Sequence, residues 1–190
     1  EVGQVPYQAL AHVFGTGPDL PGGVNDSDIA SQNGPIPIRM YRPLGEGPHP
    51  ALIFYHGGGF VIGDLNTHDK ECRLLCAKAG CIVVAVDYRL APESPFPAAV
   101  EDAWAALEWI ASEGSKLGID TTRLAVGGDS AGGNLSAVVA LMARDASLDL
   151  KLQMLVYPAT DASKYYESFS ENKDGPLLTV EVIEWFWSHY

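Results

Sequence analysis

Hydrophobic positions along the chain fall into short continuous runs separated by segments with helical spacing. The runs span 51–55, 82–86, 124–126 and 152–157. Short continuous apolar runs are typical of strands covered on both faces of a parallel sheet. Helical spacing occurs at 68–79, 98–112 and 130–144, so strands and helices alternate. The pattern predicts an α/β protein with a mostly parallel sheet and helices on both faces.

Both ends of the chain depart from this alternation. Residues 1–23 are rich in proline and glycine and are expected to form a loop-rich arm. Asn33-Gly34, a favoured hairpin turn, separates two extended runs and predicts an antiparallel pair over about 28–42. Residues 180–190 would form a helix that is apolar on more than one face and must pack against something on each side.

The helix expected at 130–144 is apolar nearly all round, which predicts that it is buried. The central unit, with its strands and helices, is expected to run from residue 24 to residue 160. Residues 161–190 would then form a separate segment after it.

Composition narrows the class of protein. With 190 residues, 47% of them hydrophobic and 19% charged, the chain can form one globular unit. The net charge of −12 argues against nucleic acid and anionic membrane surfaces as partners, because both select basic patches. No apolar run approaches the roughly 18 to 20 residues of a membrane span. The first residues lack the pattern of a signal peptide. A leader that has already been removed is an alternative, because the chain starts at Glu1 and not at a methionine. We expect a cytoplasmic protein.

The chain has three cysteines, an odd number that does not suit a secreted disulfide framework and fits a reducing compartment. His68, Cys72 and Cys76 recur at four-residue spacing and would share one helix face. A metal site is one interpretation of this spacing. Buried free thiols are the favoured interpretation, because no fourth ligand is evident.

The segment GGDSAGGN at 127–134 contains G-x-S-x-G, the spacing of a nucleophilic serine on a strand-to-helix turn. Any β-carbon at Gly128 or Gly132 would crowd such a turn. The helix that begins here aims its free N–H groups at the same point, so the N–H of Ala131 can donate to an oxyanion. The alternative is a glycine-rich turn with an idle Ser130.

A second motif, HGGGF at 56–60, follows the apolar run at 51–55. Consecutive glycines can turn tightly and point their N–H groups outward to cradle a phosphate or an oxyanion. Phosphate is disfavoured, because neither glycine cluster fits G-x-G-x-x-G and no Gly-Lys-Ser/Thr follows. His56 is interpreted as a residue that fixes the loop rather than as a base.

Together with DYRLAPE at 87–93, these motifs make the chain resemble the bacterial hormone-sensitive-lipase-like esterases, a family of α/β-hydrolases also called family IV. The resemblance covers roughly residues 24–190, and residues 161–190 resemble the start of the inserted cap. It implies a carboxylesterase that hydrolyses small-molecule esters of short to medium acyl length without a metal or organic cofactor. In DYRLAPE it implies a structural turn, with Arg89 and Glu93 in ion pairs.

The resemblance also implies roles for individual residues. Ser130 would be the nucleophile, and the N–H groups of Gly58, Gly59 and Ala131 would form the oxyanion hole. Aromatic residues of the expected cap and of the HGGGF motif would line the substrate pocket, with simple packing as the alternative. These residues are Phe60, Phe169, Trp185, Phe186 and Trp187.

The chain departs from the family pattern after Ser130. The family places an aspartate and then a histidine downstream of the nucleophile. The only histidine here is His189, and the candidate acids Asp161 and Asp174 follow no seventh strand. No residue is a credible base, since His12 and His49 lie in expected loops and His68 opens a helix.

The chain thus resembles the first two-thirds of a longer enzyme. The expected partner is a complementary C-terminal segment or a second copy of the chain, and the 190-residue chain alone is expected to be inactive. An alternative is a catalytically silent ligand-binding relative, because plant gibberellin receptors resemble this family and keep the serine but lack the histidine. An amidase or lactonase with the same apparatus is a third possibility.

Overall fold

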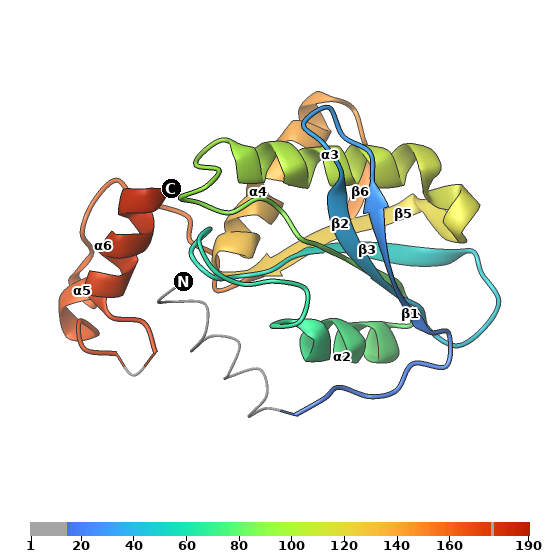
Figure 1. Ribbon diagram of the computed structural model, residues 1–190, viewed down its shortest axis with the longest axis horizontal. Coiled ribbons are helices and arrows are strands. Elements are labelled where there is room, and N and C mark those ends of the chain that lie inside the picture. Colours follow the sequence, from blue (N-terminus) through green and yellow to red (C-terminus); the bar gives the residue numbers. More distant parts are fainter. Residues whose placement is uncertain (1–14, 176) are drawn as a thin grey trace.

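The computed structural model describes residues 15–175 and 177–190 (Figure 1). Its strands are β1 Val24–Ile29, β2 Ile36–Tyr41, β3 His49–Tyr55, β4 Ile82–Val86, β5 Ile119–Asp129 and β6 Leu150–Val156. Its helices are α2 Asp69–Ala79, α3 Ala98–Glu113, α4 Ala131–Asp145, α5 Glu167–Glu171 and α6 Val180–His189, with a short 3₁₀ turn η1 at Gly114–Leu117. The predicted alternation of strands and helices is confirmed.

The strands form one sheet in the order β1-β2-β4-β3-β5-β6. The predicted antiparallel hairpin joins β1 to β2, and β2 is also antiparallel to β4. The pairs β3·β4, β3·β5 and β5·β6 are parallel. Because β3 and β5 are neighbours, with Tyr55 opposite Gly128, the two glycine-rich motifs that follow them meet at one edge of the sheet.

Helices cover both faces of the sheet (Figure 1), with α2 on one face and α3 and α4 on the other. The larger core lies beneath α3 and α4 and includes Ile53, Tyr55, Leu107, Val126 and Leu135. The smaller core lies beneath α2 and includes Tyr41, Leu52, Phe54, Cys72 and Cys76. The architecture is therefore an α/β fold with a mostly parallel sheet and helices on both faces, as the sequence pattern predicts.

The last strand differs from the prediction of a strand covered on both faces. In β6, Leu152 is 58% exposed and Leu155 is 37% exposed. The reason is its place in the sheet, because within the described residues β6 pairs only with β5. The opposite edge strand, β1, carries the polar sequence Asn25-Asp26-Ser27-Asp28 that suits an edge. By contrast, β6 has the composition of an interior strand.

Two helices are also less buried than predicted. Helix α4 buries Leu135 and Val139 against the sheet, but Leu141 on its outer face is 54% exposed. Helix α6 has no buried residue, so the expectation that it packs on each side is not met among the described residues. Figure 1 shows why: α5 and α6 lie beyond one end of the sheet, outside its two helical layers.

Residues 15–23 of the predicted arm run past α2, where a β-carbon on Gly17 would lie 2.9 Å from Cβ of Arg73. A turn at its end is closed by the Gly23 N–H, which donates to Leu20 O. The rest of the arm, residues 1–14, lies outside the described residues.

Candidate active site

Ser130 lies on the sharp turn between β5 and α4. Its φ of 52° and ψ of −115° are unusual for a residue with a side chain. The turn is held by the Ser130 N–H, which donates to Val156 O at 2.9 Å. β-Carbons on Gly128 and Gly132 would stand 2.2 and 1.9 Å from Tyr55 O, so only glycine fits at either position. The turn between strand and helix and the reason for its glycines follow the prediction from the motif, while the strain at Ser130 is added by the structure.

Ala131 begins α4 directly after the serine and is 1% exposed. The first N–H groups of a helix have no intrahelical acceptor. The Ala131 N–H therefore belongs to the group of donors that α4 presents beside Ser130.

The HGGGF loop follows β3 and turns through left-handed backbone conformations. Gly58 has a φ of +123°, Gly59 of +61° and Phe60 of +64°. The carbonyl of Gly58 accepts hydrogen bonds from the N–H groups of Val61 and Ile62, at 3.1 and 2.9 Å. The loop is therefore a defined turn beside the serine, with its glycine amides free of side chains.

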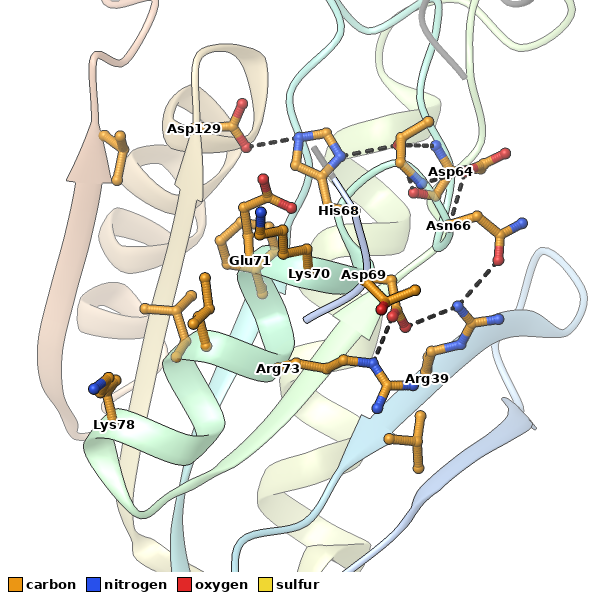
Figure 2. A pocket seen from close by; sticks show the side chains of 18 of the residues that line it. Arg39, Asp64, Asn66, His68, Asp69, Lys70, Glu71, Arg73, Lys78 and Asp129 are labelled. Atoms are coloured by element: carbon orange, nitrogen blue, oxygen red, sulfur yellow. Dashed lines mark hydrogen bonds and ion pairs between the residues drawn. The ribbon is translucent and has the colours of Figure 1, made fainter. Parts of the chain in front are cut away.

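The side chain of Asp129, the residue before the serine, joins the two motifs. The Gly57 N–H donates to Asp129 Oδ1 at 2.9 Å. The same oxygen lies 3.3 Å from Nε2 of His68, and Figure 2 shows His68 pointing at Asp129. Burial alone would raise the pKa of Asp129, but hydrogen bonds and the nearby His68 and His56 lower it below its usual range.

The prediction from sequence missed Asp129 and His68 as residues of the site. They are 61 positions apart in the numbering, and only the pairing of β3 with β5 brings them together. The position of Asp129 immediately before Ser130 was the one local signal.

His56 fixes the loop, as its interpretation from the sequence proposes. Its Nδ1 lies 2.7 Å from Gly57 O, and its ring stacks on Tyr88 at 4.4 Å. Burial and the nearby His68 lower the pKa of His56 to about 4. His56 is therefore neutral at pH 7, with Nδ1 donating to the carbonyl. Among the described residues, its Nε2 has no hydrogen-bond partner.

Among the described residues, no histidine forms a side-chain hydrogen bond with Ser130. The His189 ring contacts its own helix, with Nδ1 2.7 Å from Trp185 O. His49 begins β3, with Nε2 3.3 Å from Gly45 O, and His12 lies outside the described residues. The candidate acids are occupied locally: Asp161 accepts from the Ser163 N–H and from Tyr166, and Asp174 is paired with Lys173.

Helix α6 places aromatic rings against the HGGGF loop. The ring of Tyr190, just after α6, stacks on Phe60 at 3.8 Å with planes 7° apart. The ring of Phe186 lies against Gly59. Of the predicted substrate-binding residues, Phe60 and Phe186 thus lie at the loop, and Trp185 lies behind Phe186 with ring centroids 5.4 Å apart.

The other two aromatic candidates pack together at a distance from the loop. The ring centroids of Phe169 and Trp187 lie 6.0 Å apart, which joins α5 to α6. In DYRLAPE, Arg89 pairs with Asp102 at 2.8 Å and with Glu101 at 3.3 Å, as predicted. The matching prediction for Glu93 is wrong for the described residues, because this exposed side chain has no ion pair there.

A family model described as alpha/beta hydrolase fold matches residues 52–190. The chain belongs to the α/β-hydrolase family. Within that family, the chain belongs to the hormone-sensitive-lipase-like group, also called family IV. In this hydrolase fold, the strained Ser130 turn and the HGGGF loop lie at the carboxyl ends of β5 and β3.

Curated relatives of this hydrolase chain include two bacterial enzymes. It is 49% identical over 180 residues to the carboxylic ester hydrolase LipN of Mycobacterium tuberculosis, covering 92% of this chain and 48% of LipN. It is 41% identical over 178 residues to an ethyl acetate hydrolase of Pseudomonas putida, covering 90% of this chain and 56% of that enzyme. The hydrolase chain spans about half the length of the curated relatives it matches.

Solved structures show the same likeness. An ester hydrolase from the metagenome of Lake Arreo, solved with a derivative of bipyridine phosphonate, has a TM-score of 0.93 and 44% identity, covering 100% of this chain and 61% of that one. An esterase of Pyrobaculum calidifontis has a TM-score of 0.91 and 42% identity, covering 98% of this chain and 63% of that one.

The sequence left a metal site at His68, Cys72 and Cys76 as an alternative. The fold points these side chains in different directions. Cys72 and Cys76 are buried in the core beneath α2, while His68 turns toward Asp129. Over residues 15–175 and 177–190, no group of three or more His, Cys, Asp or Glu side chains could hold a metal ion. None of the helices described there has the length and apolar character needed to cross a membrane.

Proposed function

We propose that this chain carries the nucleophile and oxyanion hole of a serine carboxylesterase that acts on short- to medium-chain acyl esters. The observation that carries the proposal is the strained Ser130 turn beside a loop of glycines with positive φ. Strain at a residue with a side chain is characteristic of functional sites. The names of the relatives, carboxylic ester hydrolase and ethyl acetate hydrolase, support the substrate class.

In the proposed reaction, Ser130 Oγ attacks the ester carbonyl carbon and passes its proton to a histidine base. The carbonyl oxygen gains the negative charge, and N–H groups of Gly58, Gly59 and Ala131 stabilise it; one such donor is typically worth about 3 to 4 kcal/mol. The ester C–O bond then breaks, and the alcohol leaves with the proton from the histidine. Water then attacks the acyl carbon while the histidine takes its proton. The bond to Ser130 Oγ breaks, the carboxylic acid leaves, and the histidine returns the proton to Oγ.

We place the acid and histidine of the triad outside these 190 residues. Among the described residues, no histidine reaches Ser130, and the relatives are about twice as long as the matched region. Two features support a complementary C-terminal segment as the partner. The edge of β6 is unpaired within the described residues, and a groove of about 1470 Å³ opens between α2 and β6. Apolar side chains of Leu74, Leu75, Met154 and Val156 line this groove.

A second copy of the chain is the other candidate for covering this surface. The other candidate function is that of a ligand-binding protein. The observation that favours a ligand-binding protein is the lack of a base for Ser130 among the described residues. The two functions differ in one measurable property, because an activated serine reacts with a fluorophosphonate and an idle serine does not.

The test compares the product of the complete gene with the 190-residue chain and with a Ser130→Ala variant of the complete product. We expect fluorophosphonate labelling and hydrolysis of p-nitrophenyl butyrate only for the unmodified complete product. Binding of the ester without labelling or turnover would favour the ligand-binding protein. Size measurements on the 190-residue chain separate a monomer from a self-paired dimer.

A further inference from the structure

The carboxylate of Asp129 packs directly on the first glycine of the HGGGF loop. A β-carbon on Gly57 would stand 2.1 Å from Asp129 Oδ2, while the Gly57 N–H donates to Oδ1 at 2.9 Å. The Asp129 side chain is 14% exposed. One acidic side chain therefore fixes the distance between the serine turn, of which it is part, and the start of the glycine loop.

His68 holds this carboxylate from the other side. Its side chain is 9% exposed, and its Nε2 lies 3.3 Å from Asp129 Oδ1. Because an ionised carboxylate only accepts hydrogen bonds, Nε2 is the nitrogen that carries the shared proton. The other ring nitrogen, Nδ1, lies 3.0 Å from Thr67 Oγ1.

Thr67, which contacts His68, is itself held by hydrogen bonds. The Thr67 hydroxyl lies 2.8 Å from Asp64 O, and the Asp64 N–H donates to Thr67 Oγ1 at 3.0 Å. These contacts belong to the turn that precedes α2. His68 therefore connects a rigid turn to Asp129, and through Asp129 to Gly57.

We propose that His68 is a positioning residue that aims the oxyanion-hole amides of Gly58 and Gly59 through Asp129 and Gly57. This inference rests on the proposed function and deepens it. The glycines have no side chains that could fix the loop, so its aim depends on its anchors. One of these anchors is the Gly57 N–H, which donates to Asp129, the residue before Ser130. Without His68, the carboxylate loses the partner that sets its direction.

The test uses two variants with the same functional group but different reach. In His68→Gln the amide nitrogen can take the position of Nε2 and reach Asp129. In His68→Asn it can take only the position of Nδ1, toward Thr67. A His49→Gln variant controls for loss of a histidine elsewhere, since His49 lies near the other end of β3, away from Ser130.

The variants are made in the complete gene product and assayed with p-nitrophenyl butyrate. We expect His68→Asn to lower kcat about 10- to 100-fold, with KM changed less than about twofold, because a misaimed donor affects chiefly the charged intermediate. His68→Gln should keep most of kcat, and His49→Gln all of it. Equal kcat for the Asn and Gln variants, or an effect on KM alone, would overturn the inference.

A second measurement does not depend on turnover. Hydrogen exchange of the Gly57 amide, followed by NMR, should accelerate in His68→Asn and stay slow in His68→Gln. If the unmodified protein hydrolyses no ester, the proposed function fails, while the exchange of Gly57 still decides whether His68 positions the loop. Unchanged Gly57 exchange in both variants would reject the positioning role even in an active enzyme.

Discussion

The ring of Phe186 occupies the space that a side chain on Gly59 would need. A β-carbon on Gly59 would stand 2.3 Å from Cγ of Phe186. Helix α6 therefore contacts the HGGGF loop at a residue whose lack of a side chain permits the contact. The position of α6 and the conformation of the loop are thus coupled through one van der Waals contact.

This contact predicts a rescue. Gly59→Ala should lower kcat because the new methyl group displaces either the loop or Phe186. The double variant Gly59→Ala with Phe186→Ala should recover much of that loss, since only the cost of about 1 to 2 kcal/mol for a left-handed alanine is left. Ester turnover by the two variants and by Phe186→Ala alone measures the coupling.

Gly58→Ala is the matched comparison. Its β-carbon would stand 2.0 Å from the backbone oxygen of Ile62, which no side-chain deletion can move. We expect Phe186→Ala to give no recovery in this background. Recovery of Gly58→Ala, or none for Gly59→Ala, would show that Phe186 is not the obstacle.

Ser130→Ala in the complete gene product should abolish hydrolysis of a short p-nitrophenyl ester and leave the fold intact. The expected loss in kcat is on the order of 10⁶, the scale for removal of a triad nucleophile. Circular dichroism and turnover, measured on the same sample, test this. Retention of more than about a tenth of the activity would show that another residue attacks the ester.

The buried His56 predicts acid sensitivity. Burial lowers its pKa from 6.5 to about 4, so between these values the unfolded chain binds more protons than the folded one. The free energy of unfolding should therefore fall as the pH drops from about 6.5 to about 4, by about 3 kcal/mol from this residue. His56→Asn keeps a donor for Gly57 O but does not titrate. Urea unfolding across this pH range should show a smaller decline for the variant, and equal slopes would contradict the assignment.

Asp87 should act in the opposite direction. Burial, with a contribution from Asp64, raises its pKa from 3.8 to about 6. The folded state then binds more protons, so its stabilisation is present at low pH and lost as the pH rises through about 6. Asp87→Asn should raise the unfolding free energy at pH 7 but not at pH 4. As a control, Asp120→Asn should lower it at pH 7, because hydrogen bonds from Thr122 and Arg123 lower the pKa of Asp120.

The exposed face of β6 predicts that one substitution affects the 190-residue chain and the complete gene product differently. In the 190-residue chain, Leu152→Lys should reduce self-association without loss of stability, because Leu152 is 58% exposed. In the complete gene product, the same change should lower stability by about 2 kcal/mol, because the proposed C-terminal segment covers this leucine. Leu141→Lys, at a leucine that is 54% exposed on α4, is the control. Light scattering and urea unfolding provide the two measurements, and equal behaviour of the two variants would argue against a covered β6.

Local patterns predicted most of the fold, because they record which backbone each segment adopts. The apolar runs located β3, β4 and β5. The glycines around Ser130 predicted a tight turn, and they are needed there because a β-carbon would clash with Tyr55 O. The same patterns overstated the burial of β6, because an apolar strand has the same sequence whether or not its neighbour is present.

The contacts between motifs were beyond such patterns. Nothing local to His68 indicates Asp129, and nothing local to Phe186 indicates Gly59. Each pair depends on the order of strands in the sheet or on the path of the chain after β6. Sequence analysis proposed the two halves of the candidate site, and tertiary structure added the side chains that join the two motifs.

The backbone conformation of Ser130 is unfavourable for the stability of the fold but is part of the proposed catalytic turn. A φ of 52° with a ψ of −115° suits glycine, and a residue with a side chain held in such a conformation costs about 1 to 3 kcal/mol. Alanine would bear the same strain as serine, whereas glycine would relax it and remove the hydroxyl. Selection for thermal robustness alone would therefore favour glycine at this turn. Under the proposed function, Ser130 is a position where stability is given up for reactivity.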